Sequence, residues 1–148
     1  MNKQYYISEA KRAASIQINE LKKIKKIFNK SFIKAVDLIL NCKGKIIFAG
    51  IGKSGLIARK ISATFSSVGI PSFFCDPAQA LHGDMGQIEK KDILIIFSYS
   101  GNTSELTNMI KYANRYSIKI IGIASKPDSI LLKASDIKLI LPKVKESD

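Results

Sequence analysis

The sequence predicts an α/β fold, a doubly wound five-stranded parallel sheet of order 2-1-3-4-5 preceded by N-terminal helices. Three observations carry this prediction. From Lys45 onward apolar runs alternate with helical patterns, these runs lack the alternation of half-exposed strands, and two Gly/Ser loops each follow a run and open a helix. Unbroken apolar runs are typical of parallel strands that helices cover on both faces. The 148 residues suit one domain with one core, which we place at 1–148.

The N-terminal part, residues 1–44, is expected to be helical. Apolar residues recur at helical spacing from Leu21 to Phe28, with lysines mainly on the opposite side. Ser31 is the expected cap of a second helix that runs to about Leu40. We expect the apolar stripe to pack on the domain or on a sister subunit, and a membrane-surface helix is the alternative.

The α/β core, residues 45–148, is expected to alternate strands and helices. Right-handed crossovers give an open sheet, and a chain reversal after the second strand gives a flavodoxin-like order with a crevice between the first and third strands. The expected strands are Ile46 to Ala49, Ser72 to Cys75, Ile93 to Phe97, Lys119 to Ala124 and Ile137 to Leu141. The expected crossover helices are Ser54 to Val68, Thr103 to Tyr116 and Ser129 to Ala134.

The two Gly/Ser loops lie at this crevice, at residues 50–55 (GIGKSG) and 98–105 (SYSGNTSE). Each presents backbone N–H groups and hydroxyls at a helix N-terminus, which is what a bound phosphate needs. The hydroxyls of Ser98, Ser100 and Thr103 exceed what turn and capping chemistry requires. A sugar phosphate is therefore the expected ligand.

The first loop also fits the dinucleotide fingerprint GxGxxG, and Asp76 stands where a ribose-binding acid would lie. The hydroxyls of the second loop have no role in that fingerprint, so a dinucleotide-dependent oxidoreductase ranks behind a sugar-phosphate protein. A Walker A loop would need glycine where Ile47 stands, which argues against ATP hydrolysis.

The net charge of +12 raises the question of a nucleic-acid partner. Residues 1–45 carry 11 of the 24 Lys and Arg against three acidic residues, so the excess lies on the N-terminal helices. No basic run is interleaved with aromatic residues for base stacking. We expect no nucleic-acid partner.

The sequence shows no secretory segment near Met1 and no apolar run as long as a membrane span. We expect a cytoplasmic chain with no membrane partner. Cys42 and Cys75 form no CxxC pattern and have no histidine cluster nearby, so buried thiols are expected and no metal site is indicated.

Five motifs together resemble the sugar isomerase (SIS) domain of the bacterial arabinose-5-phosphate isomerases. They are GKSG at 52–55, PSFF at 71–74, PAxAxHGDxG at 77–86, SxSG at 98–101 and the Lys-Glu pair at 145–146. The resemblance covers essentially the whole chain. It implies interconversion of D-ribulose 5-phosphate and D-arabinose 5-phosphate for Kdo and lipopolysaccharide biosynthesis. An enediol path of this kind needs no metal ion, and we expect no cofactor.

The resemblance also implies a set of site residues. The active-site lysine falls on Lys53, the two essential glutamates on Glu105 and Glu146, and a substrate-contacting histidine on His82. The phosphate and sugar contacts fall on Gly52, Ser54, Ser98, Ser100 and Thr103.

Aldose–ketose isomerisation moves a proton between C1 and C2 through a cis-enediol, so one base must act on one face of the sugar. Glu105 is the expected base, because it lies in the first turn of the helix behind the phosphate loop and an anchored phosphate fixes its distance to the far carbons. Lys53 would neutralise the enediolate or the phosphate. Glu146 and His82 are both candidates for the proton transfer between O1 and O2.

The chain departs from the family pattern in three ways. Asp76 replaces a histidine of a zinc-sensitive cluster, and Ser-Gly-Asn-Thr at 100–103 replaces Ser-Gly-Glu-Ser. Relatives continue past Asp148 into a further helix, a catalytic histidine and a pair of CBS modules, which we expect this chain to lack. A sugar-phosphate-binding module or regulator without turnover is therefore the alternative function. Uncovered sheet surface would favour a dimer or a homotetramer.

Overall fold

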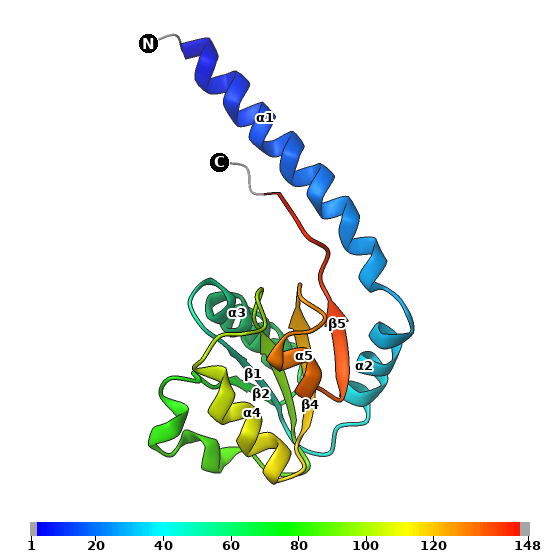
Figure 1. Ribbon diagram of the computed structural model, residues 1–148, viewed down its shortest axis with the longest axis vertical. Coiled ribbons are helices and arrows are strands. Elements are labelled where there is room, and N and C mark those ends of the chain that lie inside the picture. Colours follow the sequence, from blue (N-terminus) through cyan, green and yellow to red (C-terminus); the bar gives the residue numbers. More distant parts are fainter. Residues whose placement is uncertain (1–2, 146–148) are drawn as a thin grey trace.

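A five-stranded parallel sheet forms the centre of the computed structural model, which describes residues 3–145 (Figure 1). Its order is β2-β1-β3-β4-β5, and every neighbouring pair is parallel, which confirms the predicted fold class. The strands are β1 (Ile46–Gly50), β2 (Ser72–Phe74), β3 (Ile93–Phe97), β4 (Lys119–Ala124) and β5 (Ile137–Ile140).

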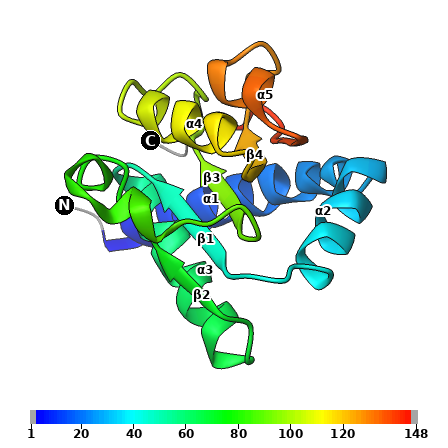
Figure 2. The ribbon, with the colours of Figure 1, turned by 90° about the horizontal axis from the view of Figure 1, so that it is seen from below.

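Helices cover both faces of this sheet (Figure 2). Helices α4 and α5 lie on one face, and α2 and α3 lie on the other. The α-helices are α1 (Lys3–Lys22), α2 (Lys30–Leu40), α3 (Lys53–Ser67), α4 (Leu106–Arg115) and α5 (Ile130–Ala134), and the 3-10 helices are η1 (Lys23–Ile27), η2 (Ala80–His82) and η3 (Asp84–Gln87).

The core has one layer on each face of the sheet, because successive strand side chains point to opposite faces. Ile47 and Leu94 pack beneath α4 and α5, while Phe48 and Ile95 pack against α2 and α3. All four side chains are buried. This double coverage explains why the strands read as unbroken apolar runs.

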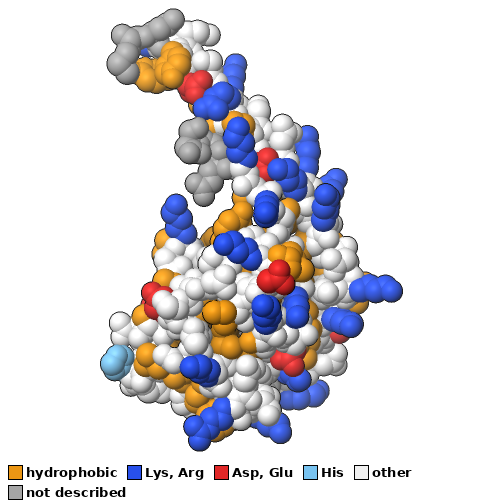
Figure 3. All heavy atoms as spheres, in the orientation of Figure 1, with side chains coloured by type: hydrophobic (Ala, Val, Ile, Leu, Met, Phe, Trp, Pro, Cys, Tyr) orange, Lys and Arg blue, Asp and Glu red, His pale blue; other side chains and the backbone are white. Residues whose placement is uncertain are grey.

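The predicted N-terminal helix differs from expectation in two respects. Helix α1 has no buried residue and projects away from the sheet, with Lys and Arg side chains along it (Figures 1 and 3). The stripe from Leu21 to Phe28 lies largely in the 3-10 helix η1, where Ile24 and Ile27 pack on the body. Leu21 and Phe28, at the two ends of the stripe, remain 66% and 58% exposed, so packing on the domain is confirmed only for Ile24 and Ile27 between them.

The cap of α2 was assigned wrongly from the sequence. Asn29, not Ser31, is the capping residue, and its side-chain oxygen accepts a hydrogen bond from the Ser31 backbone N–H at 2.8 Å. Both residue types are good helix caps, so local sequence alone does not decide between neighbours at this boundary.

The start of α4 is also later than predicted. The helix begins at Leu106 rather than Thr103, because residues 103–107 first form two tight turns. In these turns Leu106 N–H donates to Thr103 O at 3.2 Å and Thr107 N–H donates to Ser104 O at 3.0 Å. Glu105 is therefore the residue before the helix instead of a member of its first turn.

Both cysteines are free thiols, and their burial differs. Cys75 is buried as expected, and burial raises the pKa of its thiol to about 11, with Asp84 and Asp76 acting in the same direction. Cys42 is only half-buried, so the expectation of a fully buried thiol is wrong for this residue. Within residues 3–145, no helix is both long and apolar enough to cross a membrane.

Asp92 joins the start of β3 to the chain that enters β1. Its buried carboxylate accepts hydrogen bonds from the backbone N–H groups of Lys45 at 2.7 Å and Glu89 at 2.8 Å. The Lys45 ammonium lies 3.2 Å from the same carboxylate. One side chain thus satisfies two backbone donors that would otherwise lack partners.

Replacing Asp92 by alanine should lower the free energy of unfolding by about 3 kcal/mol, because it leaves buried donors and a neighbouring charge without their acceptor. Urea denaturation measures the change. Asp37→Ala, at an exposed position of α2, is the control and should change stability by less than about 0.5 kcal/mol. Equal stability of the two variants would contradict this account of Asp92.

Candidate active site

The two Gly/Ser loops meet at the carboxyl edge of the sheet, because they follow the adjacent strands β1 and β3. A cavity of about 370 Å³ lies between them. A second hollow of about 290 Å³ adjoins it and shares Lys53, Ser54, Phe97, Ser98 and Tyr99 with it. The first cavity is lined by Ile51, Lys53, Ser54, Phe97, Ser98, Tyr99, Ser100 and Thr103. The structure therefore brings together five of the side chains that the sequence assigned to the site.

Two glycines let the first loop turn straight into α3. A Cβ on Gly55 would lie 2.6 Å from the Gly50 carbonyl oxygen, so only glycine allows the helix to pass this close to β1. Gly52 has a φ of +58° and faces open space. As a result α3 begins at Lys53, and the first-turn N–H groups of the helix lie at the cavity.

The second loop is closed by its own hydroxyls. The Ser98 and Thr103 hydroxyls are 2.9 Å apart, and Ser98 Oγ also accepts from the Gly101 backbone N–H at 3.1 Å. Ser100 Oγ accepts from the Asn102 N–H at 3.3 Å. These hydrogen bonds are the turn-stabilising contacts that the sequence analysis weighed against phosphate binding. They do not use every hydroxyl proton: Ser100 only accepts, and the bond between Ser98 and Thr103 uses one of their two protons. Two hydroxyl protons therefore remain to donate to a ligand.

Lys53 supplies the charge of the cavity. It is the one charged residue among those that line the cavity and its adjoining hollow, within residues 3–145. Donor hydroxyls, the N-terminus of α3 and a cation are complementary to a phosphate dianion and offer little to a cationic or apolar ligand. The arrangement therefore suits an anion that carries more than one negative charge.

Glu105 adjoins the second loop but does not line the cavity. Its carboxylate accepts a hydrogen bond from the Ser104 hydroxyl at 2.8 Å. Its own backbone N–H and the Ser104 hydroxyl hold the pKa of this carboxyl below its usual value, against a small opposing effect of burial. Glu105 is thus ionised at neutral pH, as a general base must be.

The remaining predicted residues lie elsewhere. His82 is exposed at the end of η2 and lines neither the cavity nor its adjoining hollow. Glu146 lies outside the described residues. Sequence reasoning missed Tyr99, which lines both hollows. Its position between Ser98 and Ser100, both predicted to bind the phosphate, could have identified it as a residue of the site.

Asp76 and the glycine loop border a separate hollow of about 260 Å³. The Arg59 guanidinium lies 4.2 Å from the centroid of the Phe74 ring at this hollow. The Asp76 carboxylate accepts a hydrogen bond from the Ala78 N–H at 3.0 Å, a local loop contact. No group of three or more His, Cys, Asp or Glu side chains in the described part of the chain is placed to hold a metal ion.

Comparison with known proteins gives a consistent result. The SIS domain family model matches residues 39–147. An uncharacterized protein of Rickettsia prowazekii is 43% identical over 147 residues, covering 99% of this chain and 46% of that protein. The arabinose 5-phosphate isomerase KdsD of Escherichia coli is 39% identical over 137 residues, covering 93% of this chain and 42% of that protein. The chain spans less than half the length of these curated relatives.

Solved structures agree with the sequence relatives. A Listeria monocytogenes protein assigned as a sugar-phosphate isomerase superimposes with a TM-score of 0.95 at 34% identity, covering 100% of this chain and 78% of that one. An Escherichia coli protein in complex with arabinose 5-phosphate superimposes with a TM-score of 0.88 at 34% identity, covering 100% and 79%. The resemblance that the motifs predicted is confirmed.

Replacing Ser100 by alanine should weaken the binding of inorganic phosphate about tenfold or more, because it removes a hydroxyl that donates to a charged ligand. Isothermal titration calorimetry measures the affinity. Ser67→Ala removes an exposed hydroxyl at the far end of α3 and should bind phosphate like the unaltered chain. Equal affinities for all three proteins would mean that the anion does not occupy this loop.

The lowered pKa of Glu105 gives a second prediction. In the unaltered chain the side-chain carboxyl should titrate below 4.5, and in Ser104→Ala its midpoint should move up toward that value. The sign follows from the hydroxyl, which stabilises the charged form. An NMR titration of the Glu105 carboxyl carbon measures both midpoints. A midpoint that stays the same in Ser104→Ala would contradict the assigned contact.

Proposed function

The chain belongs to the SIS domain family, and on that premise we propose that it is a sugar-phosphate isomerase that interconverts D-ribulose 5-phosphate and D-arabinose 5-phosphate. One observation carries the proposal: the cavity that joins Lys53, at the N-terminus of α3, to the hydroxyls of Ser98, Ser100 and Thr103. Its volume of about 370 Å³ is large enough for a small phosphorylated sugar.

The proposed mechanism begins with the phosphate on the second loop. Anchoring it there holds the sugar in one orientation and turns the proton transfer into an intramolecular step. Glu105 then removes the proton from C1 of the ketose or C2 of the aldose, and returns it to the other carbon of the cis-enediol. Because Glu105 follows the phosphate loop directly, the same turn that binds the phosphate also places the base.

Lys53 has the electrostatic role in this proposal. Negative charge develops on the oxygen of the enediolate when the carbon-bound proton leaves, and a nearby ammonium stabilises it most in a site with little water. Either Glu146 or His82 would transfer the proton between O1 and O2, since the sequence offers both as candidates. The reaction requires no cofactor and no metal ion.

We assign the reaction, by the family resemblance, to Kdo and lipopolysaccharide biosynthesis in the cytoplasm, with no nucleic-acid or membrane partner. We also propose a homo-oligomer, a dimer or a tetramer. Its support is helix α1, which buries none of its residues and exposes Tyr5, Ile18 and Leu21. A helix of this length gains most of its stability in water from packing.

A coupled assay of conversion of D-ribulose 5-phosphate to D-arabinose 5-phosphate tests the proposal. The unaltered chain should turn the substrate over, and Lys53→Ala and Glu105→Gln should each lower kcat/KM by about 100-fold or more. Lys60→Ala, at an exposed position on the same helix, and Glu9→Gln, on α1, are the matched controls and should keep the full rate.

The assay is paired with calorimetric binding of D-arabinose 5-phosphate to the unaltered chain. Binding without turnover would favour the alternative function, a sugar-phosphate-binding module or regulator. Absence of both binding and turnover would contradict the sugar-phosphate assignment of the two loops.

A further inference from the structure

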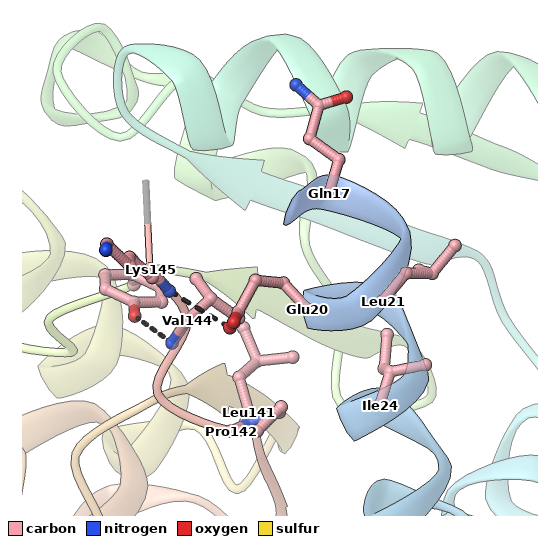
Figure 4. Close-up of a pocket in the computed structure, with 9 residues that line it drawn as sticks. Gln17, Glu20, Leu21, Ile24, Leu141, Pro142, Val144 and Lys145 are labelled. Atoms are coloured by element: carbon pink, nitrogen blue, oxygen red, sulfur yellow. Dashed lines mark hydrogen bonds between the residues drawn. The ribbon is translucent and has the colours of Figure 1, made fainter. Parts of the chain in front are cut away.

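After β5 the chain forms an extended segment, residues 141–145, which we call the C-terminal strap. The strap runs beside the base of α1 (Figure 1), and a groove of about 460 Å³ lies between the two. Figure 4 shows Leu21 and Ile24 on the helix side of this groove and Leu141 and Val144 on the strap side. The strap has no regular secondary structure, so other contacts must hold it in place.

Three hydrogen bonds fix the strap along its length. At its start, Leu141 N–H donates to the Ala124 carbonyl oxygen at 2.8 Å. Further on, Val144 N–H donates to the Tyr99 hydroxyl oxygen at 3.4 Å. At its end, Lys145 N–H donates to the Glu20 carboxylate at 3.0 Å, a contact drawn as a dashed line in Figure 4.

Tyr99 connects the strap to the phosphate loop. It lies between Ser98 and Ser100, and it lines both the phosphate cavity and the groove beneath the strap. Its carbonyl oxygen accepts two hydrogen bonds from Ser125, one from the backbone N–H at 2.9 Å and one from the hydroxyl at 2.7 Å. The backbone of Tyr99 is therefore fixed, and its side chain spans from the loop to the strap.

Glu20 holds the other end from α1. Hydrogen bonds from the Lys23 ammonium and the Lys145 backbone hold the pKa of its carboxyl below the usual value, against a small opposing effect of burial. A charged carboxylate accepts a stronger hydrogen bond from a backbone N–H than a neutral amide oxygen does. Although helix α1 has no buried residue, its Glu20 therefore contacts the C-terminal strap.

We propose that Tyr99 and Glu20 are positioning residues, which together hold the C-terminal strap against the sugar-phosphate cavity so that occupancy of the phosphate loop and the placement of the strap are linked. The inference rests on the proposed function. Leu141 lines the hollow beside Lys53, which makes the strap part of the wall of the site.

A role of this kind differs from a role in phosphate binding in its kinetic signature. Loss of a phosphate contact weakens substrate binding and raises KM. Loss of a strap contact leaves the phosphate loop intact and lowers kcat, because the wall of the site beside Lys53 is no longer held in place.

The test compares Tyr99→Phe, which removes only the hydroxyl, with Glu20→Ala and Glu20→Gln. Tyr99→Phe and Glu20→Ala should each lower kcat about fivefold or more with KM unchanged within about twofold, and Glu20→Gln, which keeps an acceptor oxygen, should recover most of the loss. Tyr116→Phe and Glu9→Gln are the controls, because both side chains lie outside the groove and the cavity. NMR measures the exchange rates of the Val144 and Lys145 amide protons in the same proteins, and these should rise in Tyr99→Phe and Glu20→Ala.

Unchanged amide exchange in both variants would overturn the proposal, as would a rise in KM with kcat unchanged. If the unaltered chain binds D-arabinose 5-phosphate but does not turn it over, the proposed function fails and amide exchange alone decides the inference. Faster exchange in the variants, together with slower exchange in the unaltered chain on adding the sugar phosphate, would then support it. Exchange that does not respond to either change would overturn it.

Discussion

The approach of α3 to β1 is the constraint on which the site depends. Gly55 passes so close to the Gly50 carbonyl oxygen that a methyl group at Gly55 would lie 2.6 Å from it. This packing allows the helix to begin at Lys53, with only Ile51 and Gly52 between it and the end of β1. Strand β3 is parallel to β1 and lies next to it, so the loop that follows β3 lies at the same edge of the sheet as the loop that follows β1. The hydroxyls of Ser98 and Thr103 therefore face the N-terminus of α3 across one cavity.

Electrostatics inside the cavity differ from those of the molecule as a whole. The chain carries a net charge of +12, and Lys and Arg side chains line the projecting helix α1 (Figure 3). The cavity holds a single lysine, and neutral hydroxyls and oriented N–H groups provide its other polar contacts. The N-terminus of α3 adds about 0.3–1 kcal/mol of favourable interaction with an anion. Recognition by fixed dipoles with one cation suits a small phosphate ester better than a long polyanion, which requires an extended basic surface.

Local sequence predicted the sheet and five of the side chains that line the cavity for a physical reason. Strands covered on both faces leave unbroken apolar runs, and the two Gly/Ser loops are short segments whose hydroxyls and glycines are adjacent in the chain. The errors fall where competing local contacts or distant ones decide the structure. Asn29 and Ser31 are both good caps, and the turns before α4 displace its start to Leu106. The contacts of Tyr99 with Val144 and of Glu20 with Lys145 join residues 45 and 125 positions apart, which no periodicity in the sequence encodes.

A crystal structure of the chain with D-arabinose 5-phosphate would show directly where the phosphate binds. We expect phosphate oxygens within hydrogen-bonding distance of the Ser98, Ser100 and Thr103 hydroxyls, with C1 and C2 of the sugar on the side of Glu105. A phosphate bound instead in the hollow beside Asp76, or a sugar whose reacting carbons point away from Glu105, would contradict this expectation.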